Sequence, residues 1–304
     1  MIRIGALLDT DSSVADVVRQ ATVIRDAGYA TAWATQTFGL DALTALAVVG
    51  AQVEDLDLGT AVIPVYPRHP QVMAQQALTV QSTTSGHLSL GIGLSHQVVV
   101  EGLWGYSFDR PARYMAEYLA ALVPLLAGEK AAVHGEVLKA VTFAPLTIPV
   151  EQRPSVLVAA LAPAMLRLAG SVADGTVTWM TGISTIESHV APRLGDAAAA
   201  AGRPVPRIVV SLPVSLTEDP ARARALIDAE SAIYPTLPSY AAMLEKEGAT
   251  SASDLGLIGS RAQIIDGIGR LESAGGTELI VAVGGTPEEK RATFELLGEV
   301  ASTS

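Results

Sequence analysis

Short apolar runs alternate with amphipathic segments along almost the whole chain. Runs such as 2–8 and 88–92 are nearly continuous in apolar residues, which is typical of strands buried on both faces. Segments with apolar residues every three or four positions predict helices instead. The predicted strands are 2–8, 31–34, 56–62, 88–92, 156–160, 175–178, 208–215 and 279–283, and the predicted helices are 14–27, 42–53, 70–84, 111–126, 164–172, 186–201, 221–234 and 287–300.

About eight strand–helix units in succession favour an α/β protein with a (β/α)8 TIM barrel over an open sheet. The 304 residues are enough for one such barrel, so we expect a single domain over 1–304. Two stretches interrupt the pattern. Residues 131–143, with a turn at His134-Gly135-Glu136, predict a small inserted hairpin between units four and five. Residues 235–274 carry extra helices over 240–247 and 262–274, before the last unit, and could cover one barrel mouth.

The strand at 88–92 runs into Gly91-Ile-Gly-Leu-Ser-His96, where glycines and polar side chains follow an apolar run. In α/β proteins, ligands bind at such carboxyl ends of strands. Gly91 and Gly93 lack a Cβ, so a flat ligand could lie against the backbone there. A dinucleotide fingerprint is disfavoured, because His96 stands where its third glycine is needed.

Composition removes several classes of function. A net charge of −11 argues against nonspecific binding to nucleic acid or to anionic membranes. The chain has no cysteine, and no two histidines have metal-ligand spacing, so we expect neither disulfides nor a metal site. No apolar run is long enough for a membrane span, which favours a cytoplasmic protein. Only 17% of residues are charged and 49% are hydrophobic, which favours a homodimer with buried apolar surface.

Five motifs, in this order, resemble those of the bacterial luciferase-like superfamily, and more narrowly those of actinobacterial coenzyme F420-dependent oxidoreductases. The resemblance covers nearly the whole chain. It implies a barrel that binds a deazaflavin, with FMN as the alternative, at the carboxyl ends of the strands. The motifs are Gln36-Thr-Phe-Gly-Leu-Asp-Ala-Leu-Thr-Ala-Leu46, Leu58-Gly-Thr-Ala-Val-Ile-Pro-Val-Tyr-Pro-Arg-His-Pro70, Gly91-Ile-Gly-Leu-Ser-His96, Phe108-Asp-Arg-Pro-Ala-Arg-Tyr114 and Ala173-Asp-Gly-Thr-Val-Thr-Trp-Met-Thr181.

The resemblance also assigns the cofactor site. It implies a backbone bulge behind the ring of the cofactor, with a non-prolyl cis peptide between Ala61 and Val62; the alternative is a plain buried strand ended by Pro64. The loop at Leu161-Ala162 corresponds to the one that holds the cofactor phosphate, since free N–H groups at a helix start bind anions. The cofactor-binding residues implied are Gln36, Thr60, Ala61, Val62, Pro64, Gly93, Leu94, Ser95, Val99, Leu161, Ala162, Trp179 and Met180.

One departure from the related dehydrogenases bears on the reaction. Those acting on sugar phosphates or alcohols carry Asp-His where this chain has Gln36-Thr37, and often an acid where it has His96. Sugar-phosphate oxidation is therefore disfavoured, and a reductase of an activated double bond or imine is favoured. His96 is the candidate catalytic proton donor. It could equally only shape the pocket.

Other readings stay open at this point. The barrel could be an FMN-dependent monooxygenase, or could bind a flavin-like ligand without turnover. Arg68 could pair with an anionic group of the cofactor or substrate, or could form an ordinary salt bridge. Arg110 and Arg113, three positions apart on one helical face, could also pair with an anion, or could only extend over apolar surface. His69, between two prolines, suits a structural helix cap better than catalysis.

Overall fold

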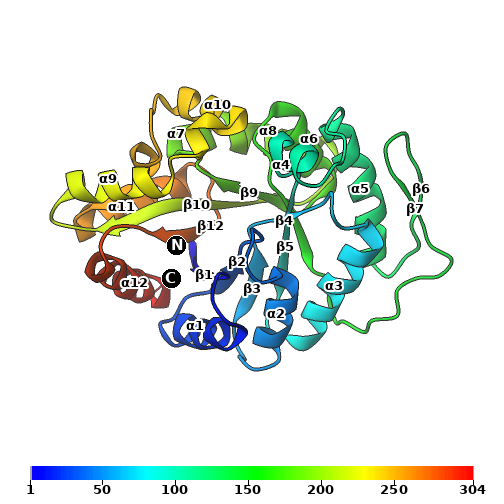
Figure 1. Ribbon diagram of the computed structural model, residues 1–304, viewed down its shortest axis with the longest axis horizontal. Coiled ribbons are helices and arrows are strands. Elements are labelled where there is room, and N and C mark those ends of the chain that lie inside the picture. The colour runs from blue at the N-terminus through cyan, green and yellow to red at the C-terminus, as the bar shows by residue number, and fades with distance from the viewer. Residues whose placement is uncertain (1, 304) are drawn as a thin grey trace.

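The structure is a computed structural model that describes residues 2–303. Eight parallel strands form a closed ring in the order β1, β2, β3, β5, β8, β9, β10, β12, and β12 pairs again with β1. The helices lie outside this ring (Figure 1). The predicted (β/α)8 TIM barrel is therefore confirmed. The ring strands are β1 (Arg3–Leu8), β2 (Thr31–Ala34), β3 (Asp57–Thr60), β5 (Leu88–Gly93), β8 (Ser155–Val158), β9 (Gly175–Trp179), β10 (Arg207–Leu216) and β12 (Glu278–Val283).

Helix starts follow the capping chemistry of the sequence. The side chains of Ser13, Asp41 and Thr286 accept hydrogen bonds from the first turns of their helices, and several helices begin at proline, whose missing N–H costs nothing there. The helices are α1 (Val14–Asp26), α2 (Ala42–Gly50), α3 (Pro70–Thr83), α4 (Gln97–Gly102), α5 (Pro111–Leu126), α6 (Pro163–Val172), α7 (Ile183–Thr185), α8 (Ala191–Ala200), α9 (Pro220–Glu230), α10 (Pro238–Glu247), α11 (Arg261–Ser273) and α12 (Pro287–Ser302).

Several elements differ from the sequence-based expectation. The strand predicted over 56–62 is interrupted after Thr60, and the short strand β4 (Ile63–Pro64) resumes pairing with β5. Helix α4 and the short strand β11 (Leu257–Gly259) were not predicted, because both are too short for a periodic pattern. Of the two helices in the stretch expected as a possible lid, α10 contacts His96 after the end of β5 through Tyr240, whereas α11 is the barrel helix between β11 and β12.

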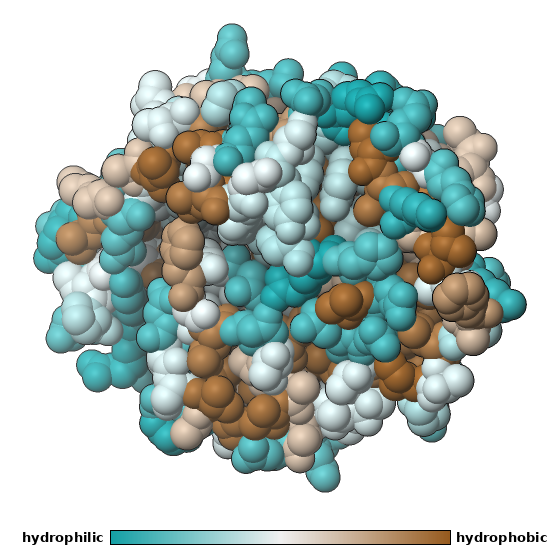
Figure 2. All heavy atoms as spheres, turned by 45° about the vertical axis from the view of Figure 1, so that its right-hand side comes forward, coloured by the Kyte–Doolittle hydropathy of each residue, from teal (hydrophilic) through white to brown (hydrophobic). Residues whose placement is uncertain are grey.

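The expected hairpin over 131–143 is confirmed. Strands β6 (Ala132–His134) and β7 (Lys139–Val141) pair antiparallel and lie outside the barrel, beyond α5 in Figure 1. Phe143, just after the hairpin, is fully exposed. On the face shown in Figure 2, hydrophobic residues form several patches separated by hydrophilic ones. In residues 2–303, no helix is long and apolar enough to cross a membrane. Pairing of two copies and a cytoplasmic location stay predictions.

A single tryptophan fills much of the barrel interior. The Trp33 ring is fully buried, and it packs with Leu157, Val209 and Ile280 from three other strands. Gly59 makes room for it, because a Cβ there would lie 2.3 Å from the Trp33 ring. The ring nitrogen of Trp33 donates a 2.9 Å hydrogen bond to the Glu278 carboxylate at the amino end of the barrel.

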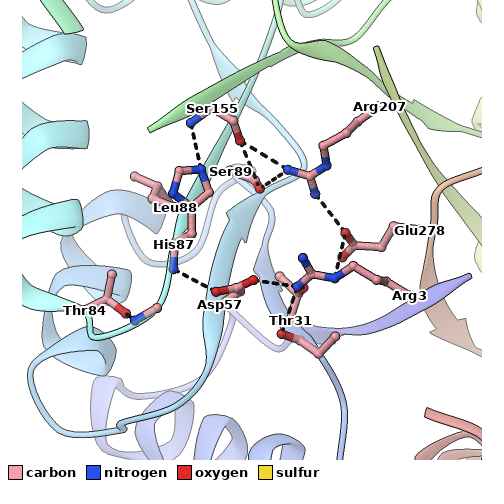
Figure 3. Close-up of polar contacts among 12 residues, drawn as sticks. Arg3, Thr31, Asp57, Thr84, His87, Leu88, Ser89, Ser155, Arg207 and Glu278 are labelled. Carbon is pink, nitrogen blue, oxygen red and sulfur yellow. Dashed lines mark hydrogen bonds and ion pairs between the residues drawn. The ribbon is translucent and has the colours of Figure 1, made fainter. Parts of the chain in front are cut away.

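A polar network closes that amino end (Figure 3). The Glu278 carboxylate is fully buried and accepts a 2.9 Å bond from the Arg207 guanidinium. Arg207 also donates to the hydroxyl of Ser89, at 2.8 Å. His87 Nε2 accepts a hydrogen bond from the backbone N–H of Ser155, at 3.2 Å. We expect this network to stabilise the fold rather than take part in catalysis, because catalytic groups of TIM barrels lie at the opposite face.

We expect His87 to make the fold sensitive to mild acid. Burial lowers the pKa of His87 below its usual 6.5, with nearby arginines acting in the same direction and Asp57 opposing them. The unfolded chain therefore binds more protons than the folded chain as the pH falls below 6.5. The free energy of unfolding should be largest above pH 6.5 and should fall as the solution is acidified.

Urea unfolding at pH 7.5 and pH 5 measures this. His87→Gln keeps an acceptor for the Ser155 N–H but cannot be protonated. The free energy of unfolding of this variant should therefore differ less between pH 7.5 and pH 5 than that of wild type. His134→Gln, at an exposed position of the hairpin, is the control and should leave it unchanged. Equal pH dependence in wild type and His87→Gln would show that other groups cause the acid sensitivity.

Candidate functional site

The predicted site residues lie at one end of the barrel. Gln36, Val62, Gly93 and Trp179 each lie at or just after the carboxyl end of a parallel ring strand, so all four lie on the same face. Ligands of TIM barrels bind at this face. Trp179, at the end of β9, is half-buried.

Two residues at this face have an uncommon backbone conformation. Ser95 has φ 62° and Met180 has φ 54°, although neither is glycine. This left-handed region costs a non-glycine residue of order 1 kcal/mol, and residues that adopt it cluster at functional sites. Met180 directly follows β9, and Ser95 comes two residues after the end of β5.

The bulge implied by the resemblance is present between β3 and β4. The peptide bond between Ala61 and Val62 is cis, which confirms that expectation. The hydroxyl of Thr60 donates a 2.8 Å hydrogen bond to the carbonyl of Gly91 and fixes the start of the bulge against β5. Ala61 and Val62 are half-buried, so their side chains are accessible from the barrel mouth.

The glycines of β5 make room for the residues of this bulge, so the backbone at these glycines is not open to a ligand. A Cβ on Gly91 would lie 1.9 Å from the carbonyl oxygen of Thr60, and a Cβ on Gly93 would lie 2.8 Å from a methyl of Val62. The expectation that a flat ligand lies directly against both glycines is therefore wrong. Thr60 and Val62 occupy the space that the missing side chains leave, and any ring would lie against the bulge itself.

The remaining residues predicted to bind the cofactor differ in how exposed their side chains are. Thr60, Pro64 and Met180 are buried, so they shape the backbone of the site rather than present a side chain. Those that are half-buried or exposed at this face are Gln36, Leu94, Ser95, His96, Val99, Leu161 and Ala162.

His96 lies at the start of α4 within a group of aromatic rings. Its imidazole contacts the ring of Tyr240, with centroids 5.7 Å apart, and Tyr240 packs edge-on against Tyr234 at 5.3 Å. Tyr234 in turn packs edge-on against Trp179, at 5.6 Å. We call these four side chains the aromatic roof. Because Tyr234 and Tyr240 come from the segment between α9 and β11, this segment joins the ends of β5 and β9 across the mouth.

The aromatic roof is a weakly polar environment. Burial lowers the pKa of His96 below 6.5, so its imidazole is neutral at neutral pH. Burial also raises the pKa values of both Tyr234 and Tyr240, so both phenols keep their protons. The roof therefore carries no charge near pH 7, while its nitrogen and hydroxyl groups can still form hydrogen bonds.

Helix α10, which carries Tyr240, is tied down at its far end. The carboxylate of Glu247 accepts hydrogen bonds from the backbone N–H groups of Ser184 and Thr185, at 3.0 and 2.7 Å, and from the Thr185 hydroxyl at 2.6 Å. A negative charge at the start of α7 also interacts favourably with the helix dipole. The lid is thus attached both at the aromatic roof and at Glu247.

The cationic residues considered for anion binding all form ion pairs within the chain. The Arg68 guanidinium pairs with the Asp41 carboxylate and donates a 3.4 Å bond to the Gln36 side-chain oxygen. That oxygen also accepts a 2.9 Å bond from the N–H of Ala42. Arg110 and Arg113 both pair with Glu136 of the hairpin turn, so the alternative that they only extend over apolar surface is wrong.

His69 caps a helix, which confirms the structural role that the sequence predicted for it. It precedes α3, and its Nδ1 accepts a 3.3 Å hydrogen bond from the N–H of Gln71. Its other ring nitrogen lies 3.2 Å from the carbonyl oxygen of Lys139 in the hairpin. Both nitrogens are therefore used within the structure.

The loop between β8 and α6 offers an open helix start. Ala162 precedes α6, and no side chain in residues 2–303 caps the helix there. Ala162, Pro163 and Ala164 are exposed and small. Pro163 has no N–H, so the free donors at the start of this ten-residue helix are the amides of Ala164 and Met165. Uncapped amides at a helix start suit a phosphate group.

Sequence reasoning missed four residues around the site: Tyr234, Tyr240, Glu247 and His189. Tyr240 and Glu247 lie in the segment expected only as a possible lid, and Tyr234 is the last residue of the helix predicted over 221–234. Helical periodicity gave no sign of which of these side chains pointed inward. His189 was seen only as one histidine on a helix. It is in fact buried and bonded to the Leu161 carbonyl, a contact across 28 residues that sequence spacing does not encode.

Known proteins with related sequences and folds include enzymes of deazaflavin chemistry. The chain is 31% identical over 194 residues to an F420-dependent glucose-6-phosphate dehydrogenase of Beutenbergia cavernae, covering 61% of this chain and 56% of that protein. It is 27% identical over 169 residues to a 5,10-methylenetetrahydromethanopterin reductase of Methanolobus tindarius, covering 54% and 50%. The chain spans about half to two thirds of the length of the curated relatives it matches.

The fold comparison extends over both whole chains. The coenzyme F420-dependent tetrahydromethanopterin reductase of Methanopyrus kandleri superposes with a TM-score of 0.82 and 19% identity, covering 98% of this chain and 97% of that one. At this identity the likeness establishes the fold alone. The sequence profile of luciferase-like monooxygenases matches residues 1–294. The chain therefore belongs to the luciferase-like monooxygenase family.

Proposed function

We propose that this protein is an F420-dependent oxidoreductase that reduces a small uncharged organic substrate. The observation that carries the proposal is the combination, at one barrel face, of the Ala61–Val62 bulge and the uncapped start of α6. The sequence relatives named for F420 support the choice of deazaflavin over FMN.

The residues present fit such a cofactor. Ala61 and Val62 offer small apolar side chains on which the face of a ring can rest, and Leu94 and Ser95 follow the end of β5, the strand that pairs with β4 just after the bulge. The exposed amides at Ala162 and Ala164 suit the phosphate. When bound and reduced, the deazaflavin would supply a hydride.

The protein's own residues have three tasks in this proposal. The bulge and the α6 start orient the ring. The aromatic roof, held by Glu247, shields the site from water, which strengthens electrostatic interactions inside it. His96 delivers a proton from its imidazole to the substrate.

The charges at the mouth favour an uncharged substrate. Arg68 is neutralised by Asp41, and the aromatic roof is neutral near pH 7. A phosphorylated substrate between Arg68 and the aromatic roof would lose its hydration and meet a cation that Asp41 already neutralises, which is costly. An activated double bond or an imine beside aromatic rings satisfies these limits.

Two measurements test the proposal. Purified protein is titrated with F420 and, separately, with FMN, and the reduced complex is then mixed with a panel of enones, cyclic imines and sugar phosphates. We expect binding of F420, weak or no binding of FMN, and oxidation of the reduced cofactor by an enone or imine. Tight FMN binding with oxygen-dependent turnover would overturn the proposal in favour of a monooxygenase, and binding without any turnover would favour a non-catalytic barrel.

A further inference from the structure

A buried histidine holds the loop that precedes α6. His189 is 5% exposed, and its Nε2 lies 2.8 Å from the carbonyl oxygen of Leu161. Because a carbonyl only accepts, Nε2 carries the hydrogen and donates it. Leu161 is followed by Ala162, which precedes the open first turn of α6.

The local helix geometry explains how His189 reaches this loop. Residues Ile186–Val190 form a π-helical turn between α7 and α8, in which the N–H of Ala191 bonds to the carbonyl of Ile186. Pro192 follows, and it has no N–H to give to the carbonyl of Ser188 four residues earlier. Widened turns of this kind occur often at functional sites.

The carbonyls released by this turn are not left unpaired. The Arg193 guanidinium donates to the carbonyl of His189 at 3.1 Å and to that of Ser188 at 3.4 Å. The turn is therefore a stable feature, and it fixes the direction of the His189 side chain.

The helix that His189 supports is also fixed along its length. Helices α6 and α8 pack so closely that a Cβ on Gly170 would lie 2.3 Å from the carbonyl oxygen of Leu194 and 2.9 Å from the Cβ of Ala197. The alanines after Leu194, which the sequence presents as ordinary helix residues, allow this approach. The contact holds the body of α6, while the His189 bond holds the loop at its start.

We propose that His189 is a positioning residue that presents the first amides of α6 to the phosphate of the cofactor. This inference rests on the proposed function. His189 does not itself reach the open helix start, because its ring is buried behind Leu161. It acts through the carbonyl of Leu161, which sets the direction of the peptide groups that follow.

The proposal predicts a loss confined to ligands that bear phosphate. Three proteins are compared: wild type, His189→Asn, which cannot place a donor at the Nε2 position, and His189→Gln, which can. Each is titrated, by ligand fluorescence, with F420 and with the same deazaflavin on its ribityl chain lacking phosphate. We expect His189→Asn to weaken F420 binding about five- to tenfold, as for one lost hydrogen bond, with the phosphate-free ligand unchanged and with affinity restored in His189→Gln.

The outcomes separate this inference from the proposed function. Equal weakening of both ligands in His189→Asn, or no weakening of either, overturns the positioning role while F420 binding by wild type still stands. If wild type binds FMN rather than F420, the proposed function fails and the same comparison is made with FMN and riboflavin. If wild type binds none of these, both proposals are overturned. Should His189→Asn fail to fold, His189→Leu, which fills the space without donating, takes its place with the same expected selectivity.

Discussion

Gly91→Ala should destabilise the protein by about 3 kcal/mol or more, the upper part of the range for overpacking a rigid interior. The added methyl would lie 1.9 Å from the carbonyl oxygen of Thr60. The neighbouring atom is backbone, so no side chain can turn aside to relieve the clash. Thr60 is also fixed by its 2.8 Å hydrogen bond to the Gly91 carbonyl, so strand and bulge would have to separate.

Denaturant unfolding of Gly91→Ala and Gly195→Ala measures the difference. Gly195 lies in α8, and a Cβ there would have no other atom within 4 Å. Gly195→Ala should be as stable as wild type or more stable by up to about 1 kcal/mol, since alanine has a higher helix propensity than glycine. Equal stability of Gly91→Ala and wild type would show that the close approach of Thr60 to β5 is not required for folding.

The barrel could be predicted from sequence because its strands are buried on both faces. Eight apolar runs, each followed by a helix, are compatible with few folds other than a barrel once the strands are assumed to pair in parallel. The interruption of the strand at 56–62 was visible only through the family resemblance. Ala61 and Val62 themselves have ordinary strand propensities, and the bulge depends on the space that Gly91 and Gly93 leave on the neighbouring strand.

The site was harder to predict than the barrel because its roof is formed by segments that are distant in sequence. The position of His96 follows from the end of β5, so strand prediction was enough to find it. Tyr240 reaches His96 from more than 140 residues away, and only the tertiary fold brings the two rings together. The same holds for Glu247 and Ser184, whose contact ties the lid to a different part of the barrel.

The structure also changes what can be expected of His96 as an acid. A buried imidazole with a lowered pKa is mostly neutral at pH 7, so only a small fraction can transfer a proton as imidazolium. Reductive turnover should then rise as the pH falls through a pKa below 6.5. This direction is opposite to the loss of stability expected from His87, so turnover is measured in the range where the fold is intact.

Our last prediction is that His96→Phe lowers reductive turnover about a hundredfold or more, the usual contribution of a positioned acid. Phenylalanine keeps a ring against Tyr240, so the aromatic roof should stay packed and affinity for F420 should change little. The imidazole nitrogens are lost, and with them the rise in turnover at low pH. Stopped-flow oxidation of the reduced cofactor, from pH 5.5 to 8, measures both effects.

Tyr240→Phe is the matched control, because it removes a hydroxyl from the aromatic roof while keeping the ring that contacts His96 and the imidazole itself. It should retain most of the turnover and the pH dependence of wild type. If His96→Phe instead loses cofactor affinity, His96 holds the pocket together and is not the acid. If turnover and its pH dependence are unchanged, the proton comes from water or through Gln36 and Thr37, which follow the end of β2.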